Sequence, residues 1–297
     1  MRVLHLSDTH LGVERWFRGA PAGWRRADDH LDAMRRALAP AFAGEVDVVL
    51  HTGDVFDRSR PHPRVIATAL ALFAEVGRLV PVLLMPGNHD RHGLSWHFAS
   101  LPPGLTIVDK PCALKLAGLR LAAVPFVRDP TAWASAAGAC CAAGVDLLLS
   151  HQCFDGSVVP GFVFRYGQQP DTVGHQHVPP GVGVVLNGHI HTPQELQLGD
   201  TRVIHVGSTE RTSFIERTEP KGALVWHADG GHVRRVDTAP RPMLVVRGAA
   251  DLGAVEPGAL VALSREARSP ELEAEVAARG GWVASWPKPS AQMPLFG

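Results

Sequence analysis

Five short apolar runs, rich in Val and Leu, each end at a block of side chains that commonly bind metals. Such runs are typical of buried strands, and strand ends are where open α/β sheets place their functional sites. The blocks are Asp8-Thr9-His10, Gly53-Asp54-Val55-Phe56-Asp57, Gly87-Asn88-His89-Asp90, Ser150-His151 and Gly188-His189-Ile190-His191. One Asp-x-His would be weak evidence, whereas five blocks at five successive strand ends predict an α/β fold with one shared site.

The first half of the chain alternates strand and helix patterns, which predicts a largely parallel sheet with helices outside it. Asp28 or Asp29 is a candidate N-cap of the first helix, and Pro61 or Pro63 suits the first turn of the second. The expected strands cover residues 2–6, 46–50 and 82–85, and the expected helices cover residues 29–42 and about 61–79.

From Leu105 onward the strand patterns are shorter and are separated by Gly and Asp. They predict a second, more antiparallel sheet packed on the first, and hence a four-layer α/β/β/α sandwich. The expected strands cover residues 106–108, 112–116, 119–124, 201–206, 223–227 and 232–236, with a helix over 132–143. The long loop over 152–180 is of the kind that is usually functional or mobile.

Arg241-Pro242 is a candidate domain boundary, so residues 1–240 are expected to form the main domain. Residues 241–286 then form a small appended module, with a strand over 243–247 and a helix over 270–279 that Ser269 caps. Residues 287–297 form a Pro-rich, flexible tail.

The charge balance and the cysteines exclude several classes of protein. Lys plus Arg and Asp plus Glu are 29 each, which argues against a strongly basic nucleic-acid binder but leaves room for a local basic surface. No apolar run approaches the ~18–20 residues that span a bilayer, and the start of the chain does not resemble a secretion signal. We therefore expect a cytoplasmic protein with no membrane contact.

Of the four cysteines, adjacent Cys140 and Cys141 are expected to be buried and reduced, and Cys153 to be a core thiol or a support for His151.

The spacing of the polar blocks predicts two metal ions. Residues i and i+2 of an extended strand end point the same way, so Asp8 and His10 can bind one ion together. Asp54 is the natural bridging carboxylate. One ion would take Asp8, His10, Asp54 and His191, and the other would take Asp54, Asn88, His151 and His189.

Nitrogen and oxygen donors without a thiolate suit Mn²⁺, Fe or Zn²⁺. Two such ions, roughly 3.5–4 Å apart, can bridge a hydroxide and clamp a phosphate for in-line attack. His89 remains as a non-ligand that can protonate the leaving oxygen or stabilise charge on the phosphoryl group. Asp57 is a candidate to orient the imidazole of His89, and Asp90 is a weaker candidate for support of the site. The pair His175 and His177 is expected not to bind a metal.

These blocks resemble the calcineurin-like metallophosphoesterase superfamily, whose pattern is D-x-H, G-D-x-x-D, G-N-H-D/E, H and G-H-x-H; the match covers Met1 to about Val206. Residues 6–12 and 53–57 resemble the SbcD branch, the bacterial relatives of Mre-type double-strand-break repair nucleases. So does the block from Gly207 to Phe214, which Glu216 and Lys221-Gly222 follow. The resemblance implies Mn²⁺-dependent exonuclease and endonuclease action on DNA phosphodiesters in repair, with an SbcC-type SMC-like ATPase as partner and a homodimer.

SbcD-like chains usually continue further past the phosphoesterase domain, so we expect the capping module after Arg241 to be reduced. Two other functions stay open. One is a phosphodiesterase or phosphatase that acts on nucleotides or small phosphoesters, which the neutral net charge also suits. The other is a tethered scaffold in which the metal site matters less.

Cationic and aromatic residues alternate after the first block, in Arg15-Trp16-Phe17-Arg18 and Trp24-Arg25-Arg26. Arg15, Arg18 and Arg26 are therefore candidates to bind a nucleic-acid substrate, because such groups stack on bases and pair with phosphates. The alternative is a packed loop in which Arg26 pairs with an acidic neighbour.

The end of the chain resembles the pentapeptide by which bacterial proteins bind the sliding clamp. Gln292 would hydrogen-bond the rim of a pocket, and Leu295 and Phe296 would fill it. A tail packed against its own domain is the alternative.

Overall fold

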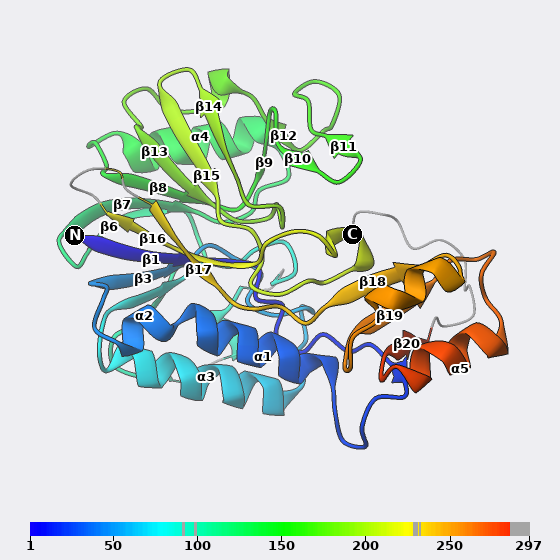
Figure 1. Cartoon of the computed structure of the whole chain (residues 1–297). Coiled ribbons are helices and arrows are strands. Elements are labelled where there is room, and N and C mark those ends of the chain that lie inside the picture. Colours follow the sequence, from blue (N-terminus) through cyan, green and yellow to red (C-terminus); the bar gives the residue numbers. More distant parts are fainter. Residues whose placement is uncertain (91–92, 98–99, 228–230, 232, 286–297) are drawn as a thin grey trace.

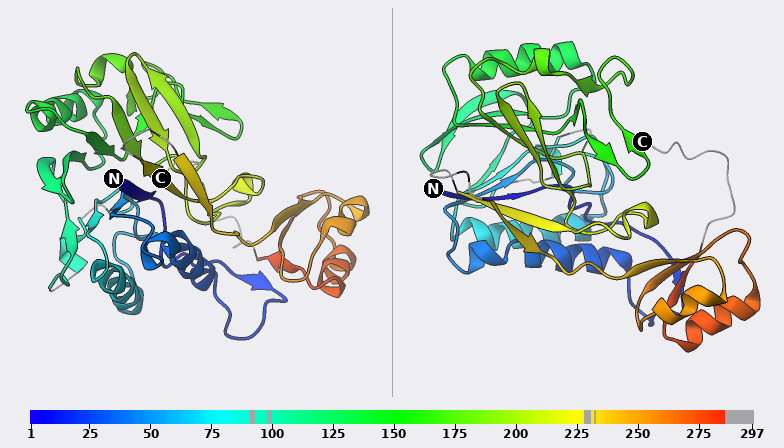
Figure 2. Two further views of the ribbon diagram at one scale, coloured as in Figure 1. Left: turned by 60° about the vertical axis from the view of Figure 1, so that its left-hand side comes forward. Right: turned by 45° about the horizontal axis from the view of Figure 1, so that its top comes forward.

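The structure is a computed structural model that describes residues 1–90, 93–97, 100–227, 231 and 233–285. Two six-stranded sheets lie face to face, with helices on both outer faces (Figures 1 and 2). Helices α1 and α3 cover the first sheet, and α4 covers the second. The predicted four-layer α/β/β/α sandwich is confirmed.

The first sheet has the order β17-β16-β1-β3-β4-β5. Its strands β1, β3, β4 and β5 are parallel, while β16 and β17 run antiparallel beside β1. The strands are β1 Arg2–Leu6, β3 Val48–His51, β4 Val82–Leu84, β5 Leu105–Ile107, β16 Gly222–His227 and β17 Val233–Asp237.

The second sheet has the order β14-β15-β13-β8-β7-β6, with four parallel strands in the middle and an antiparallel strand at each edge. The strands are β6 Cys112–Leu116, β7 Leu119–Val124, β8 Leu147–Ser150, β13 Val184–Asn187, β14 Gln194–Leu198 and β15 Thr201–His205.

The prediction of a separate, more antiparallel second sheet is therefore wrong in its membership. Strands β5, β16 and β17 were expected in the second sheet and pair within the first. The second sheet is antiparallel only at its edges. Alternation of apolar and polar residues reports which face of a strand is buried and carries no information about which strand lies beside it.

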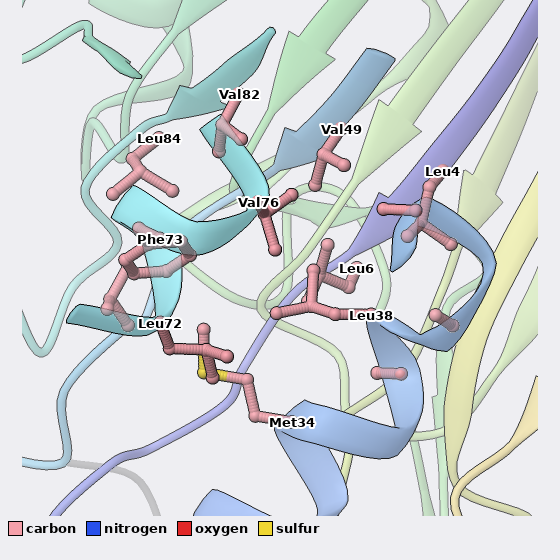
Figure 3. Packing of buried hydrophobic residues seen from close by; sticks show 14 of the residues in the cluster. Leu4, Leu6, Met34, Leu38, Val49, Leu72, Phe73, Val76, Val82 and Leu84 are labelled. Carbon is pink, nitrogen blue, oxygen red and sulfur yellow. The ribbon is translucent and has the colours of Figure 1, made fainter. Parts of the chain in front are cut away.

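The helices are α1 Arg26–Ala37, α2 Ala39–Phe42, α3 Pro63–Gly77, α4 Pro130–Cys141 and α5 Pro270–Ala278, with 3-10 turns at η1 Ser95–His97, η2 His175–His177, η3 Phe214–Glu216 and η4 Ala249–Ala254. No helix in the described ranges is long and apolar enough to cross a membrane. Leu72, Phe73 and Val76 of α3 pack with Met34 of α1 against the first sheet (Figure 3). Trp133 of α4 is fully buried against the second sheet.

The first helix differs from the prediction at both ends. Its N-cap is Arg25, and Asp28 and Asp29 lie inside the first turn, where the helix dipole also favours acidic groups. The expected single helix over 29–42 is two helices that meet at Leu38, two residues before Pro40, because proline cannot continue an α-helical interior.

The segment over 152–180 is more structured than the predicted loop. It contains the short strands β9 Cys153–Phe154, β10 Val158–Val159, β11 Phe162–Val163 and β12 Thr172–Val173, together with η2. Strands β10 and β11 form a hairpin, and β9 pairs with β12. Strands of two residues carry no periodic signal, so the sequence could not predict them.

The segment after Arg241 contributes three strands to a four-stranded sheet with the order β18-β19-β20-β2 (Figure 1). Strands β18 Met243–Val246, β19 Leu260–Leu263 and β20 Trp282–Ala284 are parallel. Its edge strand, β2 Phe17–Arg18, comes from the loop that follows the first metal-ligand block, and it pairs antiparallel with β20. The Ser269 side chain caps α5, as predicted. The small module is thus completed by a piece of the N-terminal region.

One buried ionic contact joins this module to α1. The Arg241 guanidinium donates from Nη2 to Asp29 Oδ1 at 2.7 Å and from Nε to Asp29 Oδ2 at 2.8 Å. Asp29 also accepts from Arg26 Nη1 at 2.7 Å. The guanidinium of Arg241 lies over the rings of Trp24 and Trp282, 5.4 and 4.7 Å from their centres.

We expect Asp29→Asn to lower the free energy of unfolding by about 3 kcal/mol at pH 7, because it removes the carboxylate partner of Arg241 and leaves the buried Arg26 with Glu210 alone as its anion. Burial raises the pKa of Asp29, but the hydrogen bonds from Arg241 and the charge of Arg26 outweigh it, and the net pKa is lowered. A depressed pKa stabilises the fold above the unfolded value of about 4, and this contribution is lost as the pH falls through the folded value. Denaturant unfolding should show a difference in unfolding free energy between the wild type and Asp29→Asn that is constant from pH 7 to 5. This difference should shrink below about pH 4. A difference that persists undiminished at lower pH would contradict this role for the carboxylate.

Candidate metal centre

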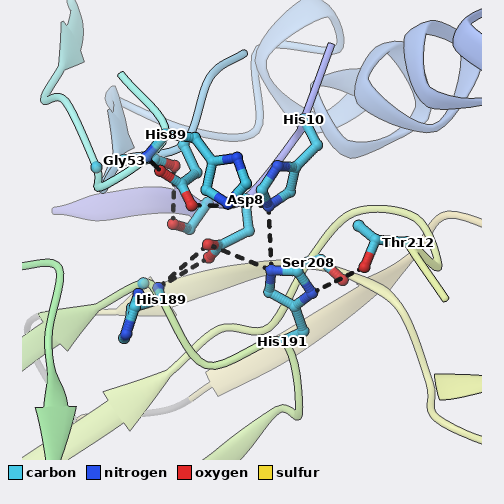
Figure 4. Close-up of polar contacts among 12 residues, drawn as sticks. Asp8, His10, Gly53, His89, His189, His191, Ser208 and Thr212 are labelled. Carbon is cyan, nitrogen blue, oxygen red and sulfur yellow. Dashed lines mark hydrogen bonds and ion pairs between the residues drawn. The ribbon is translucent and has the colours of Figure 1, made fainter. Parts of the chain in front are cut away.

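The carboxyl ends of strands from both sheets meet at one place. The polar blocks follow β1, β3 and β4 of the first sheet and β8 and β13 of the second. Figure 4 shows Asp8 and His10 facing His189 and His191 across the space between the sheets. The structure brings together all seven candidate ligands that the sequence analysis named, which are Asp8, His10, Asp54, Asn88, His151, His189 and His191.

One half of the cluster joins the two sheets through a pair of imidazoles. The Nε2 atoms of His10 and His191 lie 3.0 Å apart. Asp8 Oδ1 is 3.8 Å from His191 Nε2, and Asp54 Oδ2 is 3.7 Å from His10 Nε2. Two carboxylates and two imidazole nitrogens therefore face one another.

The other half is built around Asn88. Its Oδ1 lies 2.7 Å from His189 Nδ1 and 3.2 Å from His151 Nε2. The same Nε2 of His151 is 3.5 Å from Asp54 Oδ2. Asp54 thus contacts both halves, which is the position that the sequence analysis gave it.

The backbone around these side chains is held in unusual conformations. Asp8, His10, Asp54 and His189 all have positive φ, at 51°, 43°, 52° and 73°. Such values cost free energy for non-glycine residues and are concentrated at functional sites. Close approach also requires the glycines that precede the ligands: a Cβ at Gly87 would lie 2.2 Å from Asp54 Oδ1.

Two of the imidazoles are oriented by acceptors on their far side. His151 Nδ1 donates to the carbonyl oxygen of Thr52 at 2.7 Å, and His191 Nδ1 lies 3.2 Å from Glu216 Oε1. Each contact directs Nε2 toward the centre of the cluster. Acceptors of this kind fix the ring and its tautomer in metal sites.

The cluster shifts the pKa values of its members in opposite directions. Burial opposes ionisation of Asp54, but neighbouring His151 outweighs burial and holds the pKa of Asp54 well below its usual range. Burial likewise lowers the pKa of His151, but the charge of Asp54 outweighs it and raises the pKa to about 9. Burial raises the pKa of Asp8, and it lowers the pKa of His189 to about 3.

These residues fit divalent cations. The donors are nitrogen and oxygen atoms, and within the described parts of the chain every group of metal-type side chains that lie within mutual reach belongs to this cluster. His189 is held neutral at pH 7, as a metal ligand must be, whereas His151, with its raised pKa, would release a proton when an ion binds. The buried carboxylate of Asp8 lacks a dominant cationic partner, which a bound metal ion would supply.

His89 and Asp57 differ from the expected arrangement. His89 Nδ1 lies 2.7 Å from the main-chain oxygen of Asp57, so this carbonyl, and not the carboxylate, orients the ring. The Asp57 carboxylate lies 3.9 Å from His10 Nδ1 and 3.7 Å from Arg58 Nε. The predicted acid–imidazole pair is therefore corrected to a carbonyl–imidazole pair.

Asp90 links two of the loops that carry ligands. Its carboxylate accepts hydrogen bonds from the main-chain N–H groups of Val55, Phe56 and Gly87, at 3.0 to 3.1 Å. The contacts join the loop that carries Asp54 to the loop that carries Asn88. Asp90 thus occupies a supporting position behind the ligands.

The family model described as calcineurin-like phosphoesterase matches residues 1–193, which include all five blocks. This chain belongs to that family. The motifs of the sequence had predicted the same membership.

Three curated relatives of this phosphoesterase are DNA repair proteins or nucleases by name. The DNA double-strand break repair protein Mre11 of Haloferax volcanii is 30% identical, over 82% of this chain and 54% of the relative. Mre11 of Halobacterium salinarum is 32% identical, over 74% of this chain and 54% of the relative. The D component of the nuclease SbcCD of Rhodobacter capsulatus is 26% identical, over 89% and 76%. The chain spans about half the length of the two Mre11 relatives.

The three arginines predicted to bind substrate have different surroundings in this phosphoesterase. Arg26 is 1% exposed and forms ion pairs with Asp29 at 2.7 Å and Glu210 at 3.1 Å, so the structure contradicts a substrate role and favours the alternative of an acidic partner. Arg18 Nη2 is paired with Glu273 of α5 at 2.6 Å. Arg15 is exposed, and its charge acts on the pKa of Asp57.

Other predictions concern the cysteines, the loop histidines and the tail. Cys153 is a buried core thiol that packs with Phe164 and Ile190, and Ile190 separates two of the candidate ligands. His177 bonds locally, through Nδ1 to the main-chain N–H of Gly174 at 3.1 Å. Cys140 and Cys141 are buried and free. The predicted clamp-binding residues Gln292, Leu295 and Phe296 lie outside the described residues.

A network of charged side chains that was not predicted from the sequence lies behind His191. The fully buried Lys221 donates from Nζ to Glu216 at 2.6 Å, to Glu219 at 3.0 Å and to the main-chain oxygen of His191 at 3.0 Å. Glu216 in turn contacts His191 Nδ1. Glu216 and Lys221 were noted only as part of a motif, and a burial estimate from sequence treats Lys as exposed.

Proposed function

We propose that this chain is a dinuclear, metal-dependent phosphodiesterase that cleaves DNA in repair. The observation that carries the proposal is the convergence of seven nitrogen and oxygen donors from five strand ends, in a family of phosphoesterases. The names of the Mre11 and SbcCD relatives favour DNA as the substrate.

In this proposal Asp8, His10, Asp54 and His191 hold one ion, and Asp54, Asn88, His151 and His189 hold the other. Mn²⁺ is the expected ion, with Fe and Zn²⁺ as alternatives, because the donor set mixes imidazole with oxygen and contains no thiolate. When bound, two such ions polarise the phosphate and lower the pKa of water.

His89 is the proposed acid. Its Nδ1 donates to the carbonyl oxygen of Asp57, which can only accept, so Nε2 is the nitrogen left to exchange a proton with the leaving oxygen. His89 is half-buried, as a group that meets a substrate must be. Glu216 and the carbonyl of Thr52 keep the imidazoles of His191 and His151 in place.

The partners follow from the relatives as proposals. One relative is named as a component of the nuclease SbcCD, which suggests a second component, an SbcC-type ATPase, for this chain too. Homodimer formation and sliding-clamp binding through Gln292, Leu295 and Phe296 are separate proposals that co-purification and clamp-binding assays can test.

We expect Mn²⁺-dependent cleavage of end-labelled single- or double-stranded DNA, which a chelator abolishes. Hydrolysis of bis-p-nitrophenyl phosphate, followed in parallel, reports on the metal centre without requiring a nucleic acid. Cleavage of both substrates supports the proposal. Hydrolysis of the small diester with intact DNA would move the protein to the phosphodiesterases of nucleotides and small esters, and absence of both activities would reject an active centre.

A further inference from the structure

A groove of about 470 Å³ lies beside the metal centre, between the first turns of α1 and α3. Both helices follow parallel strands of the first sheet, so both begin at the edge of the sheet where the ligands lie. Figure 1 shows the two helices side by side under this sheet. The floor of the groove includes Leu11 and Gly12, which directly follow the candidate ligand His10.

Basic side chains outnumber acidic ones in the lining of the groove. Four arginines line it, namely Arg25, Arg58, Arg60 and Arg64, together with His62 and the acids Glu14 and Asp28. Asp28 Oδ1 lies 3.5 Å from Arg25 Nη2, and Asp57 Oδ2 lies 3.7 Å from Arg58 Nε. The side chain of Arg58 is 67% exposed.

Arg60 and Arg64 are the two arginines of the groove that no acidic group neutralises within the described part of the chain. Both are exposed, and neither side chain has a hydrogen bond or ion pair with any other residue in the described ranges. The chain as a whole has no net charge, so this local excess of guanidinium groups is a feature of the surface around the site.

Two loops of the metal centre also contribute residues to the groove. Leu11 lies next to His10, and its main-chain oxygen accepts from the N–H of Asp57 at 3.1 Å. Arg58 follows Asp57, whose carbonyl orients His89. The loops that carry candidate ligands therefore also carry part of the lining of the groove.

We infer that this groove binds the phosphates of the DNA strand that flanks the cleaved bond. The inference rests on the proposed function. Guanidinium groups pair with phosphate oxygens through two parallel hydrogen bonds, and exposed arginines spread along an open groove suit a series of phosphates better than one enclosed small anion. None of the arginines that the sequence analysis selected is part of this group.

The test compares two double variants of equal charge. Arg60→Ala/Arg64→Ala removes the unpaired cations of the groove. Arg36→Ala/Arg78→Ala removes two exposed arginines at the far ends of the same two helices, about 20 Å away at 1.5 Å per residue. Affinity for fluorescently labelled DNA is measured by anisotropy in EDTA, across a salt series, and hydrolysis of bis-p-nitrophenyl phosphate is measured with Mn²⁺.

We expect the groove variant to bind DNA about tenfold more weakly at about 150 mM salt, with a slope of log K against log salt that is reduced by about 1.5, for two lost phosphate contacts. The control variant should stay within about twofold of wild type, and both should hydrolyse the small diester normally. Equal losses of DNA affinity in the two double variants, or no loss in either, would overturn the proposed role of the groove. DNA cleavage by the wild type would still support the proposed function in that case. Wild-type protein that neither binds nor cuts DNA would overturn both.

Discussion

His89→Ala is expected to lower phosphodiester hydrolysis by about 10²- to 10⁴-fold, the range for loss of a positioned acid or base. The reason is geometric: the ring is anchored by the Asp57 carbonyl at 2.7 Å and lies beside His10, with ring centres 4.8 Å apart. The measurement is kcat/KM for bis-p-nitrophenyl phosphate and for DNA. Metal stoichiometry is measured on the same samples.

The number of metal ions bound per chain distinguishes a proton donor from a metal ligand at His89. The distinction is needed because His89 also lies within ligand distance of His10 and Asp54. A variant that still binds two ions and has lost activity supports the acid. A variant that binds one ion fewer would make His89 a ligand, and a variant with normal activity would remove it from the mechanism.

Asp57→Asn tests whether the carboxylate of Asp57 orients the imidazole of His89. Replacing an acid that orients a catalytic imidazole through its carboxylate typically costs about 10⁴ in rate. Since the main-chain oxygen of Asp57 makes the contact here, we expect Asp57→Asn to lose less than about tenfold. A loss as large as that of His89→Ala would restore the carboxylate to the role first predicted from sequence.

The convergence of the candidate metal ligands was predictable because its information is local. Each ligand lies within a few residues of an apolar run, and parallel strands bring their carboxyl ends to one edge. Asp54 and Asn88 needed only this rule to be placed together. Which oxygen of Asp57 accepts the hydrogen bond from His89 could not be predicted, because the carbonyl and the carboxylate belong to the same residue. Only the three-dimensional structure distinguishes them.

The arrangement beyond the cluster depends on long-range pairing that no local pattern carries. Strand β16 is as apolar as a strand of either sheet, and only its partner β1 assigns it to the first. Arg26 resembles a surface cation until Asp29 and Glu210 enclose it. Burial of a charged residue by its partners is therefore the feature that local sequence patterns predict least well.

Lys221 is the strongest example of this class. Its side chain is 0% exposed, and its three acceptors are two carboxylates and the carbonyl of a candidate ligand, His191. Removing the cation leaves Glu219 without its ion pair and Glu216 with His191 as its remaining charged partner. It also frees the main chain that positions His191, so stability and metal binding should change together.

We expect Lys221→Met to lower the free energy of unfolding by about 3–5 kcal/mol, the usual effect of removing one partner of a buried ion pair. Urea unfolding measures this, with Lys115→Met as the control, because Lys115 is exposed on β6 and the same change there should stay within about 0.5 kcal/mol. The double variant Lys221→Met/Glu216→Gln should lose less stability than the sum of its single variants, since the second change removes the unpaired anion. If Lys221→Met were as stable as Lys115→Met, the buried network would not hold the loop of His191, and the support of this ligand would have to come from Thr212 and the surrounding packing.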